Sequence, residues 1–479
     1  MNYKSIRYML SWVIRLESGF LLFPCLVALI YGEREGFVFL FCAVATAVTG
    51  GLFCVRKPEN MAIFAKEGFI IVALSWIVLS IVGAVPLCAT GAIPSYVDAL
   101  FEIVSGFTTT GASIIRNVEA MPRCILFWRS FSHWIGGMGV LVFMLAVIPL
   151  TGGYNMHLMR AESPGPSVGK LVPSLRQTAK ILYIMYFALT MIELVLLIAG
   201  GMPIFDSVCT TLGTAGTGGF GIKADSMDSY SYYIQVVVTI FMFLFGVNFT
   251  FYYLLINKKW REAFKMEEVK VYSAIFAVAV VLITINLVVS CGGELWVSLN
   301  DAAFSVSSVM TTTGFATADF NLWPTFSKTL LVILMFGGAC AGSTGGGIKI
   351  SRIILYAKQA KVEIVQSIHS RSVNSVKIEG KTVRSKILQS ANAFLMVYIL
   401  LFILSLLIVS FDNFGFTTTF TAVTAMLNNI GPGLDMVGPA GNYADFSVLS
   451  KIVMIFDMLL GRLEIFPLII MFAPVTWKK

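Results

Sequence analysis

Long apolar runs dominate the chain, and most of them hold about twenty residues with few charged positions. Runs of this length match the roughly 30 Å hydrocarbon core of a bilayer, in which backbone groups must be satisfied within helices. We expect ten membrane-spanning helices, over residues 9–31, 36–54, 68–90, 124–150, 179–200, 230–256, 270–291, 326–356, 387–411 and 447–473. The pattern therefore predicts an all-α polytopic membrane protein.

Four shorter segments of mixed polarity lie between paired spans after the first two. Each starts with a residue that favours a helix N-cap and reaches a glycine thirteen positions later, as in Asp98 to Gly111, Asp206 to Gly219, Asp301 to Gly314 and Thr418 to Gly431. That length fits a short helix followed by an extended turn. We expect the four starting residues to cap these helices, and for the three aspartates we favour capping over direct attraction of a cation. The segments are too short to cross lipid, so they are predicted to be re-entrant.

The order of span, short segment and span occurs four times. It predicts two added N-terminal helices followed by four pseudo-symmetric repeats around one ion pore. The chain divides accordingly into the added helices in 1–65, repeats in 66–150, 174–257, 266–360 and 387–479, and a basic cytoplasmic linker in 361–386.

Composition agrees with a membrane location, because 57% of the residues are hydrophobic and only 13% are charged. The net charge of +8 reflects where the basic residues lie, and we do not expect nucleic-acid binding. They gather between the repeats and at the chain ends: Arg56, Lys57, Lys66, Arg160, Lys170, Arg176, Lys180, Lys258, Lys259, Arg261, Lys265, Lys270, Lys358, Lys361, Arg371, Lys377, Lys381, Arg384, Lys386, Lys478 and Lys479. The positive-inside rule then makes these loops and both termini cytoplasmic, so the four short segments enter from outside.

The tips of the four segments carry the strongest candidate chemistry. Aligned on the thirteen-residue spacing they contain Thr109, Thr110 and Gly111; Thr217, Gly218 and Gly219; Thr312, Thr313 and Gly314; and Asn429, Ile430 and Gly431. A ring of four loops can replace the hydration shell of a cation with backbone carbonyls, and glycine permits the backbone angles this needs. Ordinary helix-linking turns are the alternative, but four matched copies between paired spans favour a filter.

A glycine-rich stretch interrupts the predicted span 326–356 where it should cross the middle of the membrane. The residues concerned are Gly337, Gly338, Gly342, Ser343, Thr344, Gly345, Gly346, Gly347 and Lys349. Each glycine costs a helix about 1 kcal/mol, so we expect a break that lines the ion path. Close helix packing through small residues is the alternative. A nucleotide-binding loop is excluded, because Ile348 follows Gly347 where that motif needs lysine, and Ile350 directly follows Lys349 where it needs Ser or Thr.

Arg462 is a charged residue inside a predicted span, where it costs about 2.5 kcal/mol or more and should face the pore or a carboxylate. Asp457 and Glu464 are near it in sequence, so a structural ion pair remains the alternative to a pore position. His133, His157 and His369 have no metal-ligand neighbours in the sequence, and we interpret them as structural or solvated residues.

The chain resembles the TrkH/KtrB superfamily of bacterial potassium transport subunits over nearly its whole length. The resemblance rests on the residues 66–69, 98–113, 134–139, 160–166, 218–220, 340–349, 428–433 and 461–464. The two added N-terminal helices favour the TrkH branch. In this superfamily the four repeats surround one path for K⁺, and glycine at all four filter centres looks like the potassium-selective form.

The resemblance implies further properties. The stretch from Gly337 to Lys349 would be an intramembrane gate below the filter, and Arg462 would project into the ion path. The protein would form a homodimer in the bacterial cytoplasmic membrane, under the control of a cytosolic TrkA-type nucleotide-binding ring. This chain itself would bind no nucleotide. Uptake would follow the membrane potential, with proton coupling, as in a symporter, left open.

Two other classes of function fit the sequence less well. A coupled carrier that works by alternating access usually has inverted repeats, whereas these repeats share one orientation. An intramembrane enzyme would need catalytic motifs, and the sequence contains no HExxH, no GxSxG with partners and no paired catalytic aspartates. We therefore expect a transport protein and not an enzyme.

Overall fold

The computed structural model describes residues 1–53, 64–139, 175–369 and 374–477. Several expectations fall outside these residues. They are the end of the predicted span 124–150, the motif 160–166, His157, and the basic residues Arg56, Lys57, Arg160, Lys170, Arg371, Lys478 and Lys479.

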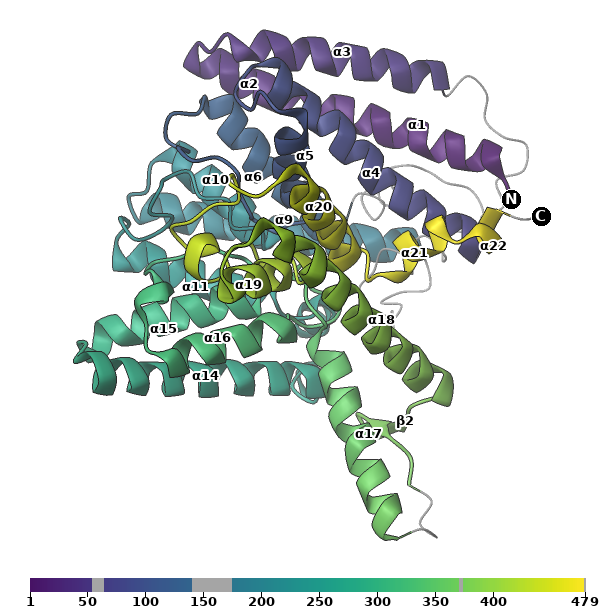
Figure 1. Cartoon of the computed structure of the whole chain (residues 1–479), viewed down its shortest axis with the longest axis vertical. Helices are drawn as coiled ribbons and strands as arrows, with labels where there is room; N and C mark the ends of the chain where they lie inside the picture. The colour runs from purple at the N-terminus through teal and green to yellow at the C-terminus, as the bar shows by residue number, and fades with distance from the viewer. Residues whose placement is uncertain (54–63, 140–174, 370–373, 478–479) are drawn as a thin grey trace.

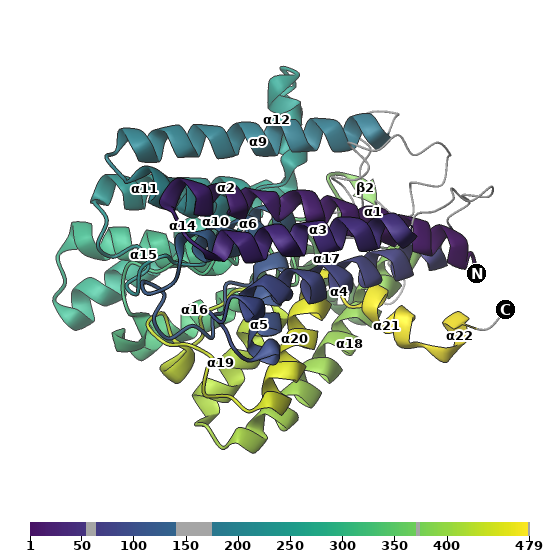
Figure 2. The ribbon, with the colours of Figure 1, turned by 90° about the horizontal axis from the view of Figure 1, so that it is seen from above.

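The chain begins with a helical hairpin of two apolar spans, as the sequence predicted. Helices α1 (Tyr3–Phe20) and α2 (Leu22–Tyr31) together form one candidate membrane span, and α3 (Glu35–Phe53) forms the next. Gly32 ends α2 in a left-handed conformation with φ of 70°, which a glycine adopts without steric cost. Helix α1 packs against α3 and α4, so the hairpin lies along the outside of the first repeat (Figure 2).

The rest of the fold repeats one unit of a long helix, a short helix and a second helix (Figure 1). The long helices are α4 (Ala65–Ala89), α9 (Leu175–Ala199), α14 (Glu267–Cys291) and α18 (Ser385–Val409). The short helices are α5 (Tyr96–Phe107), α10 (Ile204–Gly216), α15 (Leu295–Met310) and α19 (Phe416–Leu427). The second helices are α6 (Arg123–Met138), α11 (Tyr232–Phe245), α16 (Thr325–Gly337) and α20 (Val448–Arg462).

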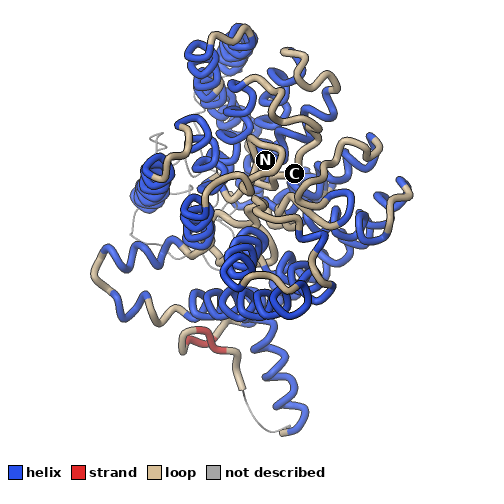
Figure 3. The backbone as a smooth tube through the Cα atoms, turned by 90° about the vertical axis from the view of Figure 1, so that its left-hand side faces the viewer, coloured by secondary structure: helices blue, strands red, loops and turns tan. Residues whose placement is uncertain are grey.

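Smaller elements connect these units. The helices among them are α12 (Phe249–Ile256), α13 (Trp260–Ala263), α17 (Ile350–Ile368), α21 (Phe466–Phe472), α22 (Pro474–Trp477), and the 3₁₀ turns η1 (Phe320–Leu322), η2 (Ser410–Asp412) and η3 (Asp435–Val437). Strands β1 (Lys377–Ile378) and β2 (Lys381–Thr382) form an antiparallel hairpin. Helix α17 and this hairpin project from the helical body (Figures 1 and 3).

The second helices are shorter than the sequence predicted. Among the described residues, six helices are long and apolar enough to cross a membrane, or seven if α11 and α12 count as one span bent by 92°. The predicted spans 230–256 and 447–473 were wrong in detail, because neither is one continuous helix. We had expected one break, after Gly337, but α11 also ends before Gly246, and a turn at 463–465 separates α20 from α21. The physical reason is that these helix ends meet the loops that fill the centre of the molecule.

The repeats close into a ring through one recurring contact. The second helix of each repeat packs against the short helix of the next, in the pairs α6 with α10, α11 with α15, α16 with α19, and α20 with α5. The last pair joins the end of the chain to its beginning. Viewed along the long helices, the loops therefore gather at the centre of the bundle (Figure 3).

Large apolar side chains cover the outside of the N-terminal hairpin and of the ring. Leu29 is 79% exposed, Phe37 76%, Val289 78% and Leu407 62%. In water such a surface would be unstable, whereas a bilayer solvates it. The start of α1 and the short helix α22 lie close together on one side of the molecule (Figure 1), where the rings of Tyr3 and Trp477 stack.

Candidate functional site

The four tips share one backbone conformation. Thr109, Thr217, Thr312 and Asn429 have φ of 56°, 55°, 59° and 55°, and Gly111, Gly219, Gly314 and Gly431 have φ of 80°, 73°, 92° and 94°. The residue between each pair has negative φ. In an ordinary strand successive carbonyls point to opposite sides, and alternating signs of φ turn them toward the same side. Each tip can therefore present a row of oxygen atoms in one direction.

The four tips also touch one another in a closed order. A Cβ added at Gly111 would lie less than 3.0 Å from the carbonyl oxygen of Gly218, in the next repeat. The same holds for three further pairs, Gly219 with the Thr313 oxygen, Gly314 with the Ile430 oxygen, and Gly431 with the Thr110 oxygen. Only glycine allows this approach. The sequence spacing thus identified the glycine that meets its neighbour in every repeat.

In the described part of the chain, a hydrogen-bonded pair of threonine hydroxyls lies behind the tip in the first and third repeats only. The hydroxyls of Thr108 and Thr110 are 2.8 Å apart, and those of Thr311 and Thr313 are 2.7 Å apart. In the fourth repeat, Asn429 instead donates from Nδ2 to the Thr110 hydroxyl at 3.0 Å. This bond shows how the fourth tip attaches to the first.

Two buried oxygen atoms at the tips have no hydrogen-bond partner among the described residues. They are Oγ1 of Thr109 and Oδ1 of Asn429, and both side chains are fully buried. Leaving such atoms unsatisfied costs free energy unless water or an ion completes the site. The Asn429 oxygen lies behind its tip, because a Cβ added at Gly461 of α20 would be 2.5 Å from it.

One cavity of about 140 Å³ opens onto the ring. All four glycines of the tips, Gly111, Gly219, Gly314 and Gly431, line it. Tyr443 also lines this cavity and donates a hydrogen bond of 2.7 Å to the Gly431 carbonyl. We call it the outer cavity.

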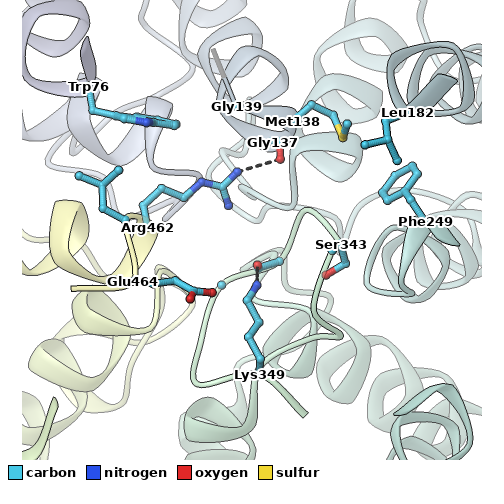
Figure 4. Close-up of a pocket in the computed structure, with 15 residues that line it drawn as sticks. Trp76, Gly137, Met138, Gly139, Leu182, Phe249, Ser343, Lys349, Arg462 and Glu464 are labelled. Carbon is cyan, nitrogen blue, oxygen red and sulfur yellow. Dashed lines mark hydrogen bonds between the residues drawn. The ribbon is translucent and has the colours of Figure 1, made fainter. Parts of the chain in front are cut away.

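A second cavity, of about 70 Å³, shares no lining residue with the outer cavity. We call it the inner cavity (Figure 4). Its lining includes Ser343, Gly345, Gly346 and Lys349 from the predicted break, together with Arg462. The volume is large enough for a few water molecules.

The break between α16 and α17 has the position that the glycine-rich stretch predicted. Helix α16 ends at Gly337 and α17 starts at Ile350, and the residues between them form a loop. Gly338, Gly342 and Gly347 have φ of 69°, 71° and 77°, so they need glycine. We refer to residues 338–349 as the central loop.

Several groups hold the central loop in place. The bend between α11 and α12 accommodates it, because Cys340 donates to the Gly246 carbonyl at 3.0 Å and Phe249 donates to the Gly342 carbonyl at 3.0 Å. Lys349 is 2% exposed and donates from Nζ to the Gly345 carbonyl within the loop. The bend between α11 and α12, which the sequence analysis missed, thus makes room for the central loop.

Two other side chains of the predicted gate also bond to backbone carbonyls. Ser343 donates to the Cys340 carbonyl at 2.6 Å, and Thr344 donates to the Phe245 carbonyl at 3.2 Å. Because Phe245 ends α11, the bond from Thr344 again joins the central loop to the bend between α11 and α12.

Arg462 bridges the fourth repeat, the first repeat and the central loop. It donates from Nη1 to the Thr344 carbonyl at 2.8 Å, and from Nη2 to the carbonyls of Gly136 and Gly137, the latter also at 2.8 Å (Figure 4). The carboxylates considered as its partners bond elsewhere. Glu464 forms an ion pair with Arg352, and Asp457 accepts from the Ser405 hydroxyl at 2.7 Å.

The four predicted N-caps were wrong. The residues at the N-cap positions are Ser95, Pro203, Glu294 and Gly415. Asp98, Asp206 and Thr418 each occupy the third position of their helix, and Asp301 lies two turns in. The helices start earlier because Ser95 accepts from the Asp98 N–H, and because Pro203 and Gly415 are already extended.

The three aspartates bond instead to side chains of the surrounding segments. Asp98 forms a 2.7 Å ion pair with Lys451, Asp206 accepts from the Tyr230 hydroxyl at 2.8 Å, and Asp301 accepts from the Thr317 hydroxyl at 3.2 Å. An aspartate in the first turn still faces free N–H groups and the positive end of the helix dipole. The role in stabilising the helix start therefore survives for Asp98 and Asp206, without the cap.

Sequence reasoning also missed a buried ion pair. Glu102 and Arg129 are 0% and 1% exposed at the side chain and lie 2.7 Å apart. Arg129 falls inside the predicted span 124–150. The cost of burying a charge, which drew attention to Arg462, applies to Arg129 equally and could have found it.

Comparison with known proteins gives one consistent result. The TrkH family, described as "Cation transport protein", matches residues 36–479. The Trk system potassium uptake protein TrkH of Escherichia coli (strain K12) is 35% identical over 497 residues, covering 100% of both chains. TrkG of the same strain is also 35% identical, over 99% of this chain and 98% of that protein.

A solved structure agrees with the sequence comparison. The crystal structure of the potassium transporter TrkH from Vibrio parahaemolyticus superposes with a TM-score of 0.90 at 32% identity, and each chain is covered completely.

Proposed function

Because the chain belongs to the TrkH family of cation transport proteins, we propose that it carries K⁺ into the bacterial cell through the ring of its four tips. Membership of the family makes the protein a multi-pass membrane transporter and not an enzyme. The observation that carries the proposal is the closed order of contacts, in which each tip glycine lies against the carbonyl of the next repeat.

A filter of this kind works by replacing water. K⁺ enters the outer cavity, loses its hydration shell and is coordinated by the carbonyls of the residues from Thr109 to Gly111 and their counterparts. The four short helices point their C-terminal ends at the tips, and the partial negative charge of those ends favours a cation. These groups are fixed before the ion arrives, so little reorganisation is needed.

The central loop acts as the gate below the filter. It lines the inner cavity, and Arg462 holds it to Gly136 and Gly137 of the first repeat. The positive charges of Arg462 and Lys349 face the same cavity, where they oppose a cation that leaves the filter. Opening requires the central loop to separate from Arg462, so that both the backbone and the charge leave the path.

Orientation and drive follow from the charges of the loops. The basic segments, which include Lys258 and Lys358, lie in the cytoplasm, and the outer cavity faces outward. The membrane potential then supplies about 2.3 kcal/mol per elementary charge for each 100 mV, which draws K⁺ inward. Proton coupling would add to this drive.

The transporter functions as a homodimer in the cytoplasmic membrane, with a separate cytosolic TrkA-type ring that binds nucleotide and moves the gate. The relatives named above are described as parts of a Trk system, which is consistent with a separate partner. Helix α17 and the β1–β2 hairpin project from the body beside the central loop and can transmit the movement (Figure 1).

A cation-replacement experiment tests the function. The purified protein is reconstituted into vesicles loaded with K⁺, and uptake of Rb⁺ is followed while external K⁺, Rb⁺ or Na⁺ is exchanged. We expect K⁺ and Rb⁺ to compete and Na⁺ to compete poorly. Flux without preference for K⁺, or no flux both alone and with the nucleotide-binding partner, would contradict the proposal.

A further inference from the structure

One face of α6 carries two buried polar residues that contact the filter loop of the next repeat. Arg129 and His133 are four positions apart, so they lie one turn apart on the same side of the helix. Both meet the ring of Phe220, the residue that follows Gly219 in the second tip. The Arg129 guanidinium carbon lies 4.1 Å from the ring centroid, and the imidazole and phenyl centroids are 4.3 Å apart.

His133 also bonds to the backbone on both of its ring nitrogens. The N–H of Phe220 donates to Nε2 at 3.3 Å, so Nε2 carries no proton. Nδ1 must then carry it and donates to the Gly106 carbonyl, 2.8 Å away. A neutral imidazole thus links the short helix of the first repeat to the tip of the second.

Arg129 connects the first and second repeats from the side of the outer cavity. It donates to the Ser113 hydroxyl at 3.2 Å and to the Gly221 carbonyl at 3.4 Å, while Nε pairs with Glu102. Glu102 in turn accepts from the N–H of Ile114 at 2.9 Å. Ser113 and Ile114 follow Gly111, and Gly221 follows Gly219. The partners of this ion pair therefore lie just outside the filter.

These contacts fix the carbonyl that meets Gly111. Gly218 lies between the short helix and Phe220, and a Cβ added to it would collide with the His133 ring. The carbonyl oxygen of Gly218 points at Gly111 across the boundary between the repeats. A displacement of Phe220 would move Gly218 and Gly219 with it, because the three residues are adjacent in the chain.

We propose that Arg129 and His133 are positioning residues for ion selectivity, which act by clamping Phe220 and so hold the Gly218 and Gly219 carbonyls at the spacing that suits K⁺. The proposal rests on the filter proposed above. Selectivity depends on these residues because a carbonyl site that loosens can also contract around the smaller Na⁺.

The third repeat provides a matched control. Phe315 follows Gly314 as Phe220 follows Gly219, and both rings are 2% exposed. Among the described residues, no arginine or lysine lies over the Phe315 ring. Substituting either phenylalanine with leucine removes a buried ring beside the filter, but only Phe220→Leu removes ring contacts with Arg129 and His133.

The first experiment compares K⁺ and Na⁺ permeability of reconstituted Phe220→Leu, Phe315→Leu and Phe220→Tyr. We expect Phe220→Leu to lower the K⁺/Na⁺ ratio by about tenfold, since small errors in the placement of a positioned group are costly. Phe315→Leu should lower it less, and Phe220→Tyr should retain it because the ring remains. Equal losses in the two leucine variants would assign the effect to lost packing and overturn the proposal.

A second pair of variants decides the matter if Phe220→Leu does not fold. In His133→Asn the amide nitrogen can replace Nδ1 and keep the Gly106 bond, whereas in His133→Gln the amide oxygen can replace Nε2 and keep the Phe220 bond. We expect the glutamine variant to retain selectivity and the asparagine variant to lose it. The opposite order, or no change in either, would overturn the proposal. A wild-type protein without K⁺ preference would instead refute the filter itself.

Discussion

The backbone N–H of Gly346 donates a hydrogen bond of 2.6 Å to the side-chain hydroxyl of Thr312. The central loop is thereby joined directly to the tip of the third repeat. Thr312 has the same backbone conformation as Thr217, but the Thr217 hydroxyl donates to the Gly216 carbonyl within its own tip. One of the four tips is thus attached to the proposed gate through its side chain.

Thr312→Val tests this attachment. Valine keeps the shape of the side chain and removes the hydrogen-bond acceptor. The closed arrangement should be destabilised by about 1 kcal/mol, which should raise basal K⁺ flux about fivefold. Thr217→Val is the control, because its hydroxyl does not reach the central loop, and we expect a smaller increase. Flux in reconstituted vesicles without partner measures both. Equal behaviour of the two variants would show that the bond does not hold the gate.

Arg462→Gln should raise basal flux further. As an order-of-magnitude guide, a unit charge opposes a cation at a separation of about 8 Å by about 2 kcal/mol at an effective dielectric constant of 20, which corresponds to roughly thirtyfold in rate. Arg462→Lys keeps the charge but cannot reach Thr344, Gly136 and Gly137 at once, so we expect an intermediate flux. A glutamine variant that stays as closed as the wild type would exclude Arg462 from the gate.

Shortening the central loop between Gly337 and Gly347 should also raise basal flux. The residues removed carry the bonds to Gly246, Phe249 and Arg462 that hold the loop across the inner cavity. Potassium uptake by cells that lack other uptake systems, followed by flux from purified protein, measures the effect. A shortened protein that inserts normally and remains closed would count against a gating role.

Gly111→Ser should admit Na⁺ more freely. The added Cβ would collide with the Gly218 carbonyl at a position with φ of 80°, so the ring must open at that boundary. Gly91→Ser is the control for backbone strain alone, because Gly91 has φ of 76° and open space around it. The K⁺/Na⁺ permeability ratio is the measurement. A ratio that is unchanged in Gly111→Ser would refute the filter at this position.

Asp98→Asn should lower the free energy of unfolding in detergent by about 1–3 kcal/mol, and with it the melting temperature. Lys451 is 7% exposed at the side chain and would lose its ion-pair partner. The loss falls below that of a fully buried pair, since Asp98 is 27% exposed. Asp206→Asn is the matched control, because an amide oxygen can still accept from Tyr230. Equal melting temperatures for the two variants would contradict this account.

The sequence predicted the parts of the fold that repeat. Apolar run length identified the long helices such as α4 and α14, and the thirteen-residue spacing identified Gly111 and its three counterparts as the points where repeats meet. Both patterns are local in sequence and are imposed by physical requirements, the thickness of a bilayer and the steric demand of positive φ. The glycines from Gly337 to Gly347 predicted the break after α16 for the same reason.

The remaining features depend on contacts between distant segments. The bend after α11 is needed because the central loop occupies that space, and the sequence shows only Gly246 and the polar Asn248 in an apolar run. Asn248 caps α12 by accepting from the Thr250 N–H at 2.9 Å. Likewise, nothing in the order of residues pairs Glu102 with Arg129, or aims Arg462 at Gly136 and not at Glu464.

The closed ring is made from one polypeptide, and each quarter of it is therefore encoded separately. A mutation alters a single quarter, and the other three can hold the ring together while that quarter diverges. The first and third tips each have two threonines before the glycine, while the second has Thr217 and Gly218 and the fourth Asn429 and Ile430. In the proposed filter, the preference among ions can therefore change by steps of one quarter, which a ring of four identical chains cannot do.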